Sequence, residues 1–201
     1  MDIRNQSLFP GSYFHIYNRG LNSRNVFFER ENCRYFLQQY EKYVSPFART
    51  YAYCLLSNHF HFLVQIREEE VIRDVCKQSS QHSPHWYVSN AFASWLKSYT
   101  QAVNKRYGYT GAVFERPFKR IEVKTDDYFT NLVAYIHQNP VKHRIRKEFE
   151  SYPFSSYQSL VRSNHITNLE REELMNWFGG LDVFIAFHRL PPKVDPASVL
   201  E

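Results

Sequence analysis

The sequence predicts one α+β domain in which helices cover one face of an antiparallel sheet. Segments with strand-like alternation and segments with helical apolar spacing follow one another in the order β, α, β, β, α, β, α. Two strand-like segments adjoin as a hairpin, a common unit of antiparallel sheets. The length of 201 residues fits one domain with extensions better than two full domains.

Three strands and one helix are predicted in the first third of the chain. Residues 13–19 are aromatic and β-branched, which indicates a strand. Apolar side chains recur at helical spacing over residues 30–44. The apolar runs 50–56 and 60–66 are separated by a polar pair, and this pattern predicts two strands joined by a tight turn.

The remaining elements follow the hairpin. Residues 67–86 combine an acidic run with a polar stretch and predict an irregular insertion. An apolar stripe over 87–106 predicts a long helix, and 112–123 contains the pattern of a further strand. A last domain helix is expected over 126–139, because a proline follows, and 170–188 contains one more helical stretch.

We therefore expect a domain over residues 1–160 and an acidic C-terminal extension with one helix over 161–201. The three cysteines, Cys33, Cys54 and Cys76, form no CxxC pair, so neither a disulfide framework nor a zinc ribbon is expected. No apolar run approaches the ~18 residues that a membrane span requires. The sequence thus predicts a cytoplasmic protein without a membrane partner.

Positive charge is concentrated in one part of the chain. Residues 97–147 hold 11 Lys or Arg against 4 Asp or Glu, so this segment exceeds the net charge of +5 of the whole chain. Tyr and Phe residues are interspersed with these cations. A basic and aromatic segment is typical of a surface that binds a polyanion, most simply nucleic acid. A solvated helix face is the alternative explanation.

Two histidines open the second strand of the hairpin. His59 and His61 alternate with Phe60 and Phe62, so both imidazoles are expected on one face of the sheet. Neutral imidazoles so placed can bind one divalent cation if a third group completes the shell. Alternatively, the two histidines are hydrogen-bonded on a half-exposed sheet face.

A tyrosine stands near the end of the last domain helix. Tyr135 and Asn139 are four residues apart and therefore share one helix face. A tyrosine hydroxyl can attack a phosphodiester when a metal stabilises the developing charge. The alternative is that Tyr135 is one of the 15 tyrosines that only pack.

These motifs together resemble a known family, the single-tyrosine transposases of the HUH endonuclease class. The resemblance is closest to the branch of REP-associated tyrosine transposases and covers roughly residues 12–160. The motifs that carry it are Tyr17-Asn18-Arg19-Gly20, Asn58-His59-Phe60-His61, Phe114-Glu115-Arg116-Pro117-Phe118-Lys119, Tyr135-Ile136-His137-Gln138-Asn139-Pro140 and Tyr152-Pro153-Phe154-Ser155-Ser156-Tyr157.

The resemblance implies a ferredoxin-like antiparallel sheet and an enzyme that cleaves and rejoins hairpin-bearing single-stranded DNA with Mg²⁺ or Mn²⁺. His59 and His61 match the metal ligands, and Tyr135 matches the nucleophile that forms a 5′-phosphotyrosine. The third ligand corresponds to Asn139, with Gln138 as the alternative because Asn139 precedes a proline.

The resemblance also gives the basic residues a role as phosphate contacts. The expected DNA-binding residues are Arg19, Lys105, Arg106, Arg116, Lys119 and Arg120. Arg19 could instead shape a turn with its neighbours. Residues 152–157 are expected to clasp the core, and His82, His85, His165 and His188 are expected to carry no chemistry.

Two other functions fit the same residues. One is a domesticated relative that binds hairpin DNA or RNA without cutting it. The other is a metal-dependent phosphodiesterase that uses water, with Tyr135 as a packing residue. A monomer is favoured over a homodimer.

Overall fold

A four-stranded antiparallel sheet lies at the centre of the computed structural model, which describes residues 6–77, 81–162 and 168–193. The strands are β1 (Tyr13–Arg19), β2 (Ala48–Leu56), β3 (His59–Ile66) and β4 (Lys119–Val123). Their order across the sheet is β2-β3-β1-β4, and all neighbours are antiparallel. The predicted α+β class is confirmed, and the order β, α, β, β, α, β is that of a ferredoxin-like fold.

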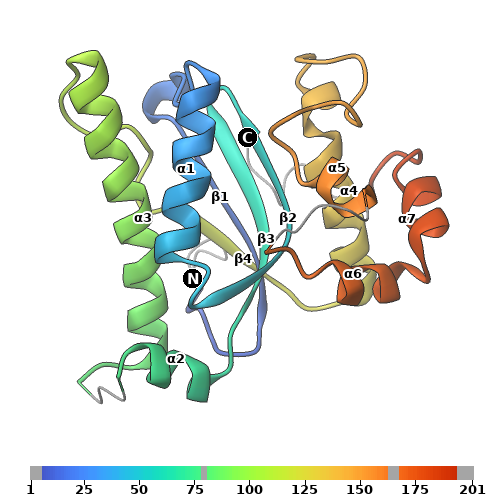
Figure 1. Ribbon diagram of the computed structural model, residues 1–201, viewed down its shortest axis with the longest axis horizontal. Helices are drawn as coiled ribbons and strands as arrows, with labels where there is room; N and C mark the ends of the chain where they lie inside the picture. Colours follow the sequence, from blue (N-terminus) through green and yellow to red (C-terminus); the bar gives the residue numbers. More distant parts are fainter. Residues whose placement is uncertain (1–5, 78–80, 163–167, 194–201) are drawn as a thin grey trace.

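Helices cover both faces of the sheet, so the prediction of one covered face is wrong (Figure 1). Helices α1 (Arg30–Tyr43) and α3 (Pro84–Tyr107) pack on one face, and α4 (Asp126–Lys142) packs on the other. The second face also carries α5 (Tyr157–Val161), α6 (Arg171–Phe178) and α7 (Leu181–Phe187). The cause lies in the strands: on β3, Phe62 faces α1 and α3 while Leu63 faces α4, so both faces are apolar.

Aromatic side chains fill the core between the sheet and helices α1 and α3. The Trp95 ring lies 4.4 Å from that of Phe36 and 5.2 Å from that of Phe60, measured between centroids. The indole N–H of Trp95 donates a hydrogen bond to the carbonyl of Phe36 at 3.0 Å, which satisfies its polar atom. Many of the aromatic residues noted in the sequence therefore serve packing.

The irregular insertion predicted over residues 67–86 is shorter than expected. It contains a helix, α2 (Glu69–Val75), whose first turn holds two glutamates that the helix dipole favours. Helix α3 begins inside the segment at Pro84, and the side chain of Ser83 caps it by accepting a backbone N–H. Residues 78–80 lie outside the described residues.

Non-strand segments cover both outer edges of the sheet. The predicted clasp over residues 152–157 is confirmed, because it runs along the free edge of β2, where Leu55 N–H donates to the carbonyl of Phe154 at 2.9 Å. On the outer edge of β4, Glu122 N–H donates to the side-chain oxygen of Gln6 at 2.8 Å. Both edge strands thus find partners for backbone groups.

The C-terminal region forms two helices where one was predicted over 170–188. Gly179 and Gly180 have φ angles of 77° and 122°, which separate α6 from α7. Leu174 and Phe184 are buried in the same hydrophobic cluster as the inner face of α4. Among the described residues, no helix is both long and apolar enough to cross a membrane.

Candidate functional site

The predicted histidines and tyrosine meet at the end of the sheet where β1 finishes and β3 begins. His59 and His61 lie opposite Arg19 and Tyr17 on β1, and both imidazoles face the side covered by α4. The ring of Tyr135 contacts the ring of His61 edge-on, with 5.7 Å between centroids. The expected sharing of one face by the two histidines is therefore met.

A second buried histidine, His15, contacts His61. The Nε2 atom of His15, a fully buried residue of β1, lies 2.9 Å from Nδ1 of His61, and the two rings stack. The Nε2 atom of His61 has no hydrogen-bond partner within the described ranges. Burial, reinforced by neighbouring imidazoles and Lys142, keeps the pKa of His61 well below its ordinary value. The ring is therefore neutral at neutral pH, the form that binds metals.

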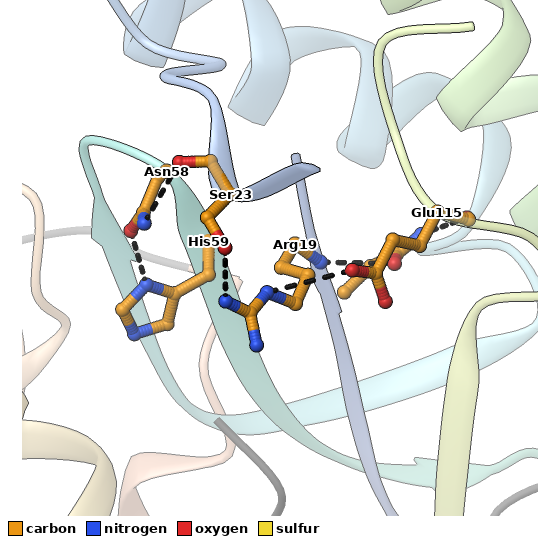
Figure 2. A network of polar contacts seen from close by, with 6 residues as sticks. Arg19, Ser23, Asn58, His59 and Glu115 are labelled. Atoms are coloured by element: carbon orange, nitrogen blue, oxygen red, sulfur yellow. Dashed lines mark hydrogen bonds and ion pairs between the residues drawn. The ribbon is translucent and has the colours of Figure 1, made fainter. Parts of the chain in front are cut away.

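Asn58 orients His59 in a similar way (Figure 2). The Nδ1–H of His59 donates to Oδ1 of Asn58 at 2.6 Å, and the amide of Asn58 donates to the carbonyl of Ser23 at 3.4 Å. The Nε2 atom of His59 is buried and has no partner in the part of the chain that the structure describes. Burial first, then the positive potential of His143, lowers the pKa of His59 to about 3.

Helix α4 continues beyond the predicted end at residue 139. It reaches Lys142, whose Nζ lies 4.8 Å from the centroid of the Tyr135 ring, in cation–π contact. His143 caps the helix, and its ring lies 4.6 Å from that of His59. The longer helix thus adds two basic side chains to the surroundings of Tyr135.

Asn139 remains helical although a proline follows it. Pro140 has no N–H to donate to the carbonyl of Ile136 one turn earlier, and the Asn139 side chain lies beside this part of the helix. Its Nδ2 donates to the carbonyl of Tyr135 at 2.8 Å and lies 3.5 Å from that of Ile136. The Oδ1 atom of Asn139 is buried without a partner among the described residues.

Three buried polar atoms of these residues have no hydrogen-bond partner among the described residues: Nε2 of His59, Nε2 of His61 and Oδ1 of Asn139. Imidazole nitrogens with an amide oxygen are a reasonable ligand set for a divalent cation. Gln138, the alternative third ligand, instead donates to the carbonyl of His188 at 2.6 Å. Over the described residues, no group of three His, Cys, Asp or Glu could hold a metal, so the amide is needed.

Three of the six predicted DNA-binding residues lie along β1 and β4. Lys119 lies opposite Tyr17 on the neighbouring strand. Lys119 and Arg19 therefore lie on the same face of the sheet as His59 and His61. Arg120 points to the opposite face, where its guanidinium lies 5.0 Å from the ring of Phe118, and burial lowers its pKa. The structure does not bring Arg120 together with the other two.

The other three predicted cations belong to the same end of the molecule. Lys105 and Arg106 occupy the last turn of α3, and Arg116 is exposed in the segment before β4. Arg106 is paired with Glu29 at 2.6 Å, so its charge is partly neutralised. Lys105 and Arg116 are the more available of the three for an anionic partner.

Arg19 shapes a turn, one of the two roles that the sequence left open. Its guanidinium donates to the side chain of Ser23 and lies 3.5 Å from the carboxylate of Glu115 (Figure 2). Gly20 allows this turn, because a Cβ there would lie 2.0 Å from the carbonyl oxygen of Arg24. Any larger residue would displace the loop.

The sequence alone assigned no role to four residues of this site, His15, Tyr17, Lys142 and His143. The alternation that placed the two β3 histidines on one face applies equally to β1 and would have placed His15 and Tyr17 together on one face of the sheet. The other two were missed because the helix was expected to stop at the proline.

The remaining histidines have structural partners. His82 stacks on Trp86 at 3.8 Å between centroids, and His85 accepts a backbone N–H at 2.9 Å. His188 is hydrogen-bonded to the imidazole of His137, with 2.8 Å between the two ring nitrogens. That these histidines carry no chemistry stays a prediction, and His165 lies outside the described residues.

Comparison with known proteins supports the resemblance of the motifs. No protein-family model matches the chain. The chain is 28% identical over 124 residues to a protein of Haemophilus influenzae named "Putative REP-associated tyrosine transposase"; the match covers 59% of this chain and 63% of that protein. A solved structure of a REP-associated tyrosine transposase bound to a REP hairpin has a TM-score of 0.58, covers 84% of this chain and 90% of its own, and is 17% identical.

The fold is similar to that of the solved REP-associated tyrosine transposase, and here it places paired histidines beside a helical tyrosine. Together with the sequence match, this similarity makes the chain a homologue of REP-associated tyrosine transposases.

Proposed function

We propose that this protein is a transposase that cuts and rejoins hairpin-bearing single-stranded DNA through a covalent bond to Tyr135. The observation that carries the proposal is the contact of the Tyr135 ring with His61, beside buried acceptor atoms of His59 and Asn139 that have no partner among the described residues. The hairpin DNA in the solved structure of a similar transposase supports this class of substrate.

The covalent step exchanges one phosphodiester for another. The hydroxyl oxygen of Tyr135 attacks the scissile phosphorus, a Tyr–O–P bond forms and the bond from phosphorus to the 3′-oxygen breaks. The hydroxyl proton is transferred to the departing 3′-oxygen, which leaves a 5′-phosphotyrosine and a 3′-OH. A 3′-OH of another end reverses the reaction, so no nucleotide cofactor is consumed.

The chain's own residues prepare this site for a divalent cation. Asn58 fixes the proton of His59 on Nδ1, and His15 engages Nδ1 of His61, so that both Nε2 lone pairs are available. When bound to His59, His61 and Asn139, Mg²⁺ or Mn²⁺ would polarise the phosphate and stabilise its developing charge.

Lys142 contributes positive charge on the other side of the nucleophile. Its ammonium group lies over the Tyr135 ring, where it favours negative charge on the phenol oxygen as the proton leaves. Lys105, Arg116 and Lys119 would contact phosphates of the bound strand, with Arg19 and Arg106 in lesser roles because each is ion-paired with a glutamate.

Residues 1–160 would form the catalytic unit of a monomer, and 161–201 an extension that supports α4. The buried contacts of Leu174 and Phe184 on the face of α4 support this division of roles.

The burial of Tyr135 favours a second candidate function, that of a non-cleaving hairpin binder. Tyr135 is only 3% exposed, as expected for a packing residue. In that case the histidines and tyrosine would stabilise the fold, and the protein would bind DNA or RNA without forming an adduct.

The decisive experiment compares Tyr135→Phe with the wild type on labelled single-stranded hairpin DNA. Phe keeps the ring and its packing, so folding and DNA binding should persist, while cleavage and the protein–DNA adduct on a denaturing gel should vanish. EDTA should have the same effect on the wild type.

Tyr128→Phe is the matched control on the same helix and should retain both cleavage and adduct. An adduct formed by Tyr135→Phe at the wild-type rate would refute the assignment. A cut without an adduct in the wild type would instead identify a phosphodiesterase that uses water, and a mobility shift alone would identify the binder.

A further inference from the structure

A pocket of about 480 Å³ lies between the loop after β1 and the last turn of α3. One wall is the loop that contains the 3-10 turn η1 (Leu21–Ser23), with Arg24 and Phe28. The opposite wall is Asn104 with Tyr109 in the loop after α3. Its volume is within the range of ligand-binding pockets, roughly 300–1,000 Å³.

Exposed rings line this pocket. Phe28 is 44% exposed and Tyr109 is 53% exposed, and their centroids are 6.2 Å apart. Tyr107 lies behind them, 4.8 Å from Phe28, and its hydroxyl donates to Glu29 and so fixes the cluster. Flat rings held at a surface beside cations are the usual stacking platform for unpaired bases.

The walls are preformed by backbone contacts. Leu21 N–H donates to the carbonyl of Val113 at 3.0 Å, and the side-chain amide of Asn104 donates to the carbonyl of Gly111 at 2.9 Å. The Oδ1 atom of Asn104 is buried at this wall and has no partner among the described residues. It can accept a hydrogen bond from an N–H of a ligand.

Backbone strain marks the loop that joins this pocket to the candidate metal ligands. Asn22 and Ser23 have φ angles of 55° and 59°, a conformation that costs a non-glycine residue energy and is found at functional sites. The carbonyl of Ser23 accepts from Asn58, which holds His59, and the next residue, Arg24, lines the pocket. The loop after β1 therefore contacts the residue that holds His59 and also lines the pocket.

We infer that this pocket, with Phe28, Tyr109 and Asn104 as its contacts and Arg24 at its rim, binds one unpaired nucleobase of the DNA strand. The inference rests on the proposed binding of single-stranded DNA. The rings stack on the base, Asn104 accepts an N–H from its edge, and Arg24 faces the adjoining phosphate. Because stacking dominates, the pocket accepts purines and pyrimidines alike.

Photocrosslinking tests the position of the base directly. The probe is a hairpin oligonucleotide with five thymidines on each flank, in which each thymidine in turn is replaced by 5-iodo-2′-deoxyuridine. Irradiation of the wild-type complex should link one flanking position to Tyr109 or Phe28, as identified by mass spectrometry of the peptides. Crosslinks confined to other parts of the protein would overturn the inference.

Binding measurements give an independent test. Tyr109→Ala should weaken binding of the same hairpin about tenfold, while Tyr109→Phe should bind like the wild type because the ring remains. An abasic nucleotide at the crosslinked position should weaken wild-type binding equally and remove the difference from Tyr109→Ala. Trp86→Ala is the matched control, since Trp86 is 43% exposed at the opposite end of α3.

The outcomes separate this inference from the proposed function. Cleavage with no crosslink at the pocket and no effect of Tyr109→Ala would refute the pocket and leave the transposase intact. Crosslinking at Tyr109 without any cleavage would support the pocket and refute the catalytic assignment.

Discussion

Acidification should destabilise the protein through His188, which joins the end of α7 to α4. Its Nδ1–H donates to the carbonyl of Phe184 at 2.8 Å, and its Nε2 lies 2.8 Å from Nδ1 of His137. Further along, Nε2 of His137 lies 2.8 Å from the hydroxyl of Ser156. The titratable groups that face His188 are His137 and, from α5, Tyr157. Protonation would place an N–H on Nε2 of His188, where it would face the N–H on Nδ1 of His137 instead of accepting from it.

The sign and size of the effect follow from the pKa of His188. Burial lowers it from 6.5 to about 4, while the unfolded chain keeps the ordinary value. Between these values the unfolded chain binds the extra proton, so stability is complete above pH 6.5 and falls as the pH drops toward 4. With about 1.4 kcal/mol per unit of pKa difference, the loss at pH 4.5 is about 2 to 3 kcal/mol.

Urea denaturation of the wild type and His188→Gln at pH 7 and pH 4.5 measures this loss. Buried histidines that do not contact His188 titrate in both proteins, so their contributions largely cancel, whereas the hydrogen-bonded His137 contributes to the measured difference. The variant should be less stable at pH 7, and its deficit should shrink by about 2 to 3 kcal/mol at pH 4.5. His82→Gln, at an exposed position, is the control and should show no such change. A deficit that is equal at both pH values would refute the reasoning.

Two further predictions concern the site. His15→Phe keeps the stacking on Tyr17 but removes the contact with Nδ1 of His61. The affinity for Mn²⁺, measured by isothermal titration calorimetry, should therefore fall about 10- to 100-fold. An unchanged affinity would exclude a positioning role of His15. Binding of single-stranded hairpin DNA should weaken with salt, with a log–log slope of about −0.7 per phosphate contact, and the charge reversals Arg116→Glu and Lys119→Glu should reduce that slope. Equal binding of plain duplex would contradict this surface.

The sequence predicted the sheet and its main helices well because their periodicities are strong. The alternation through His59 and His61 placed both imidazoles on one face, and the hairpin fixed the pairing of β2 with β3. The second layer of helices was missed because alternation alone does not show that β3 is apolar on both faces.

The details of the site were harder to predict because they depend on contacts between distant segments. The partnership of His15 with His61 joins residues 46 positions apart and follows only from the register of β1 with β3. Asn139 is helical although average preferences disfavour α geometry before a proline, and its side chain donates to the carbonyl of Tyr135. The domain limits and the roles of the site residues stay predictions.

The covered edges of the sheet also bear on how the chain behaves at high concentration. An open edge strand presents backbone groups that can pair with another copy, which leads to strand exchange and aggregation. Here residues 152–156 occupy the free edge of β2, and Gln6 occupies that of β4. A chain cut off before Tyr152 would retain every proposed catalytic residue, yet it would expose β2 along its length. We therefore expect such a shortened protein to self-associate, whatever its chemistry.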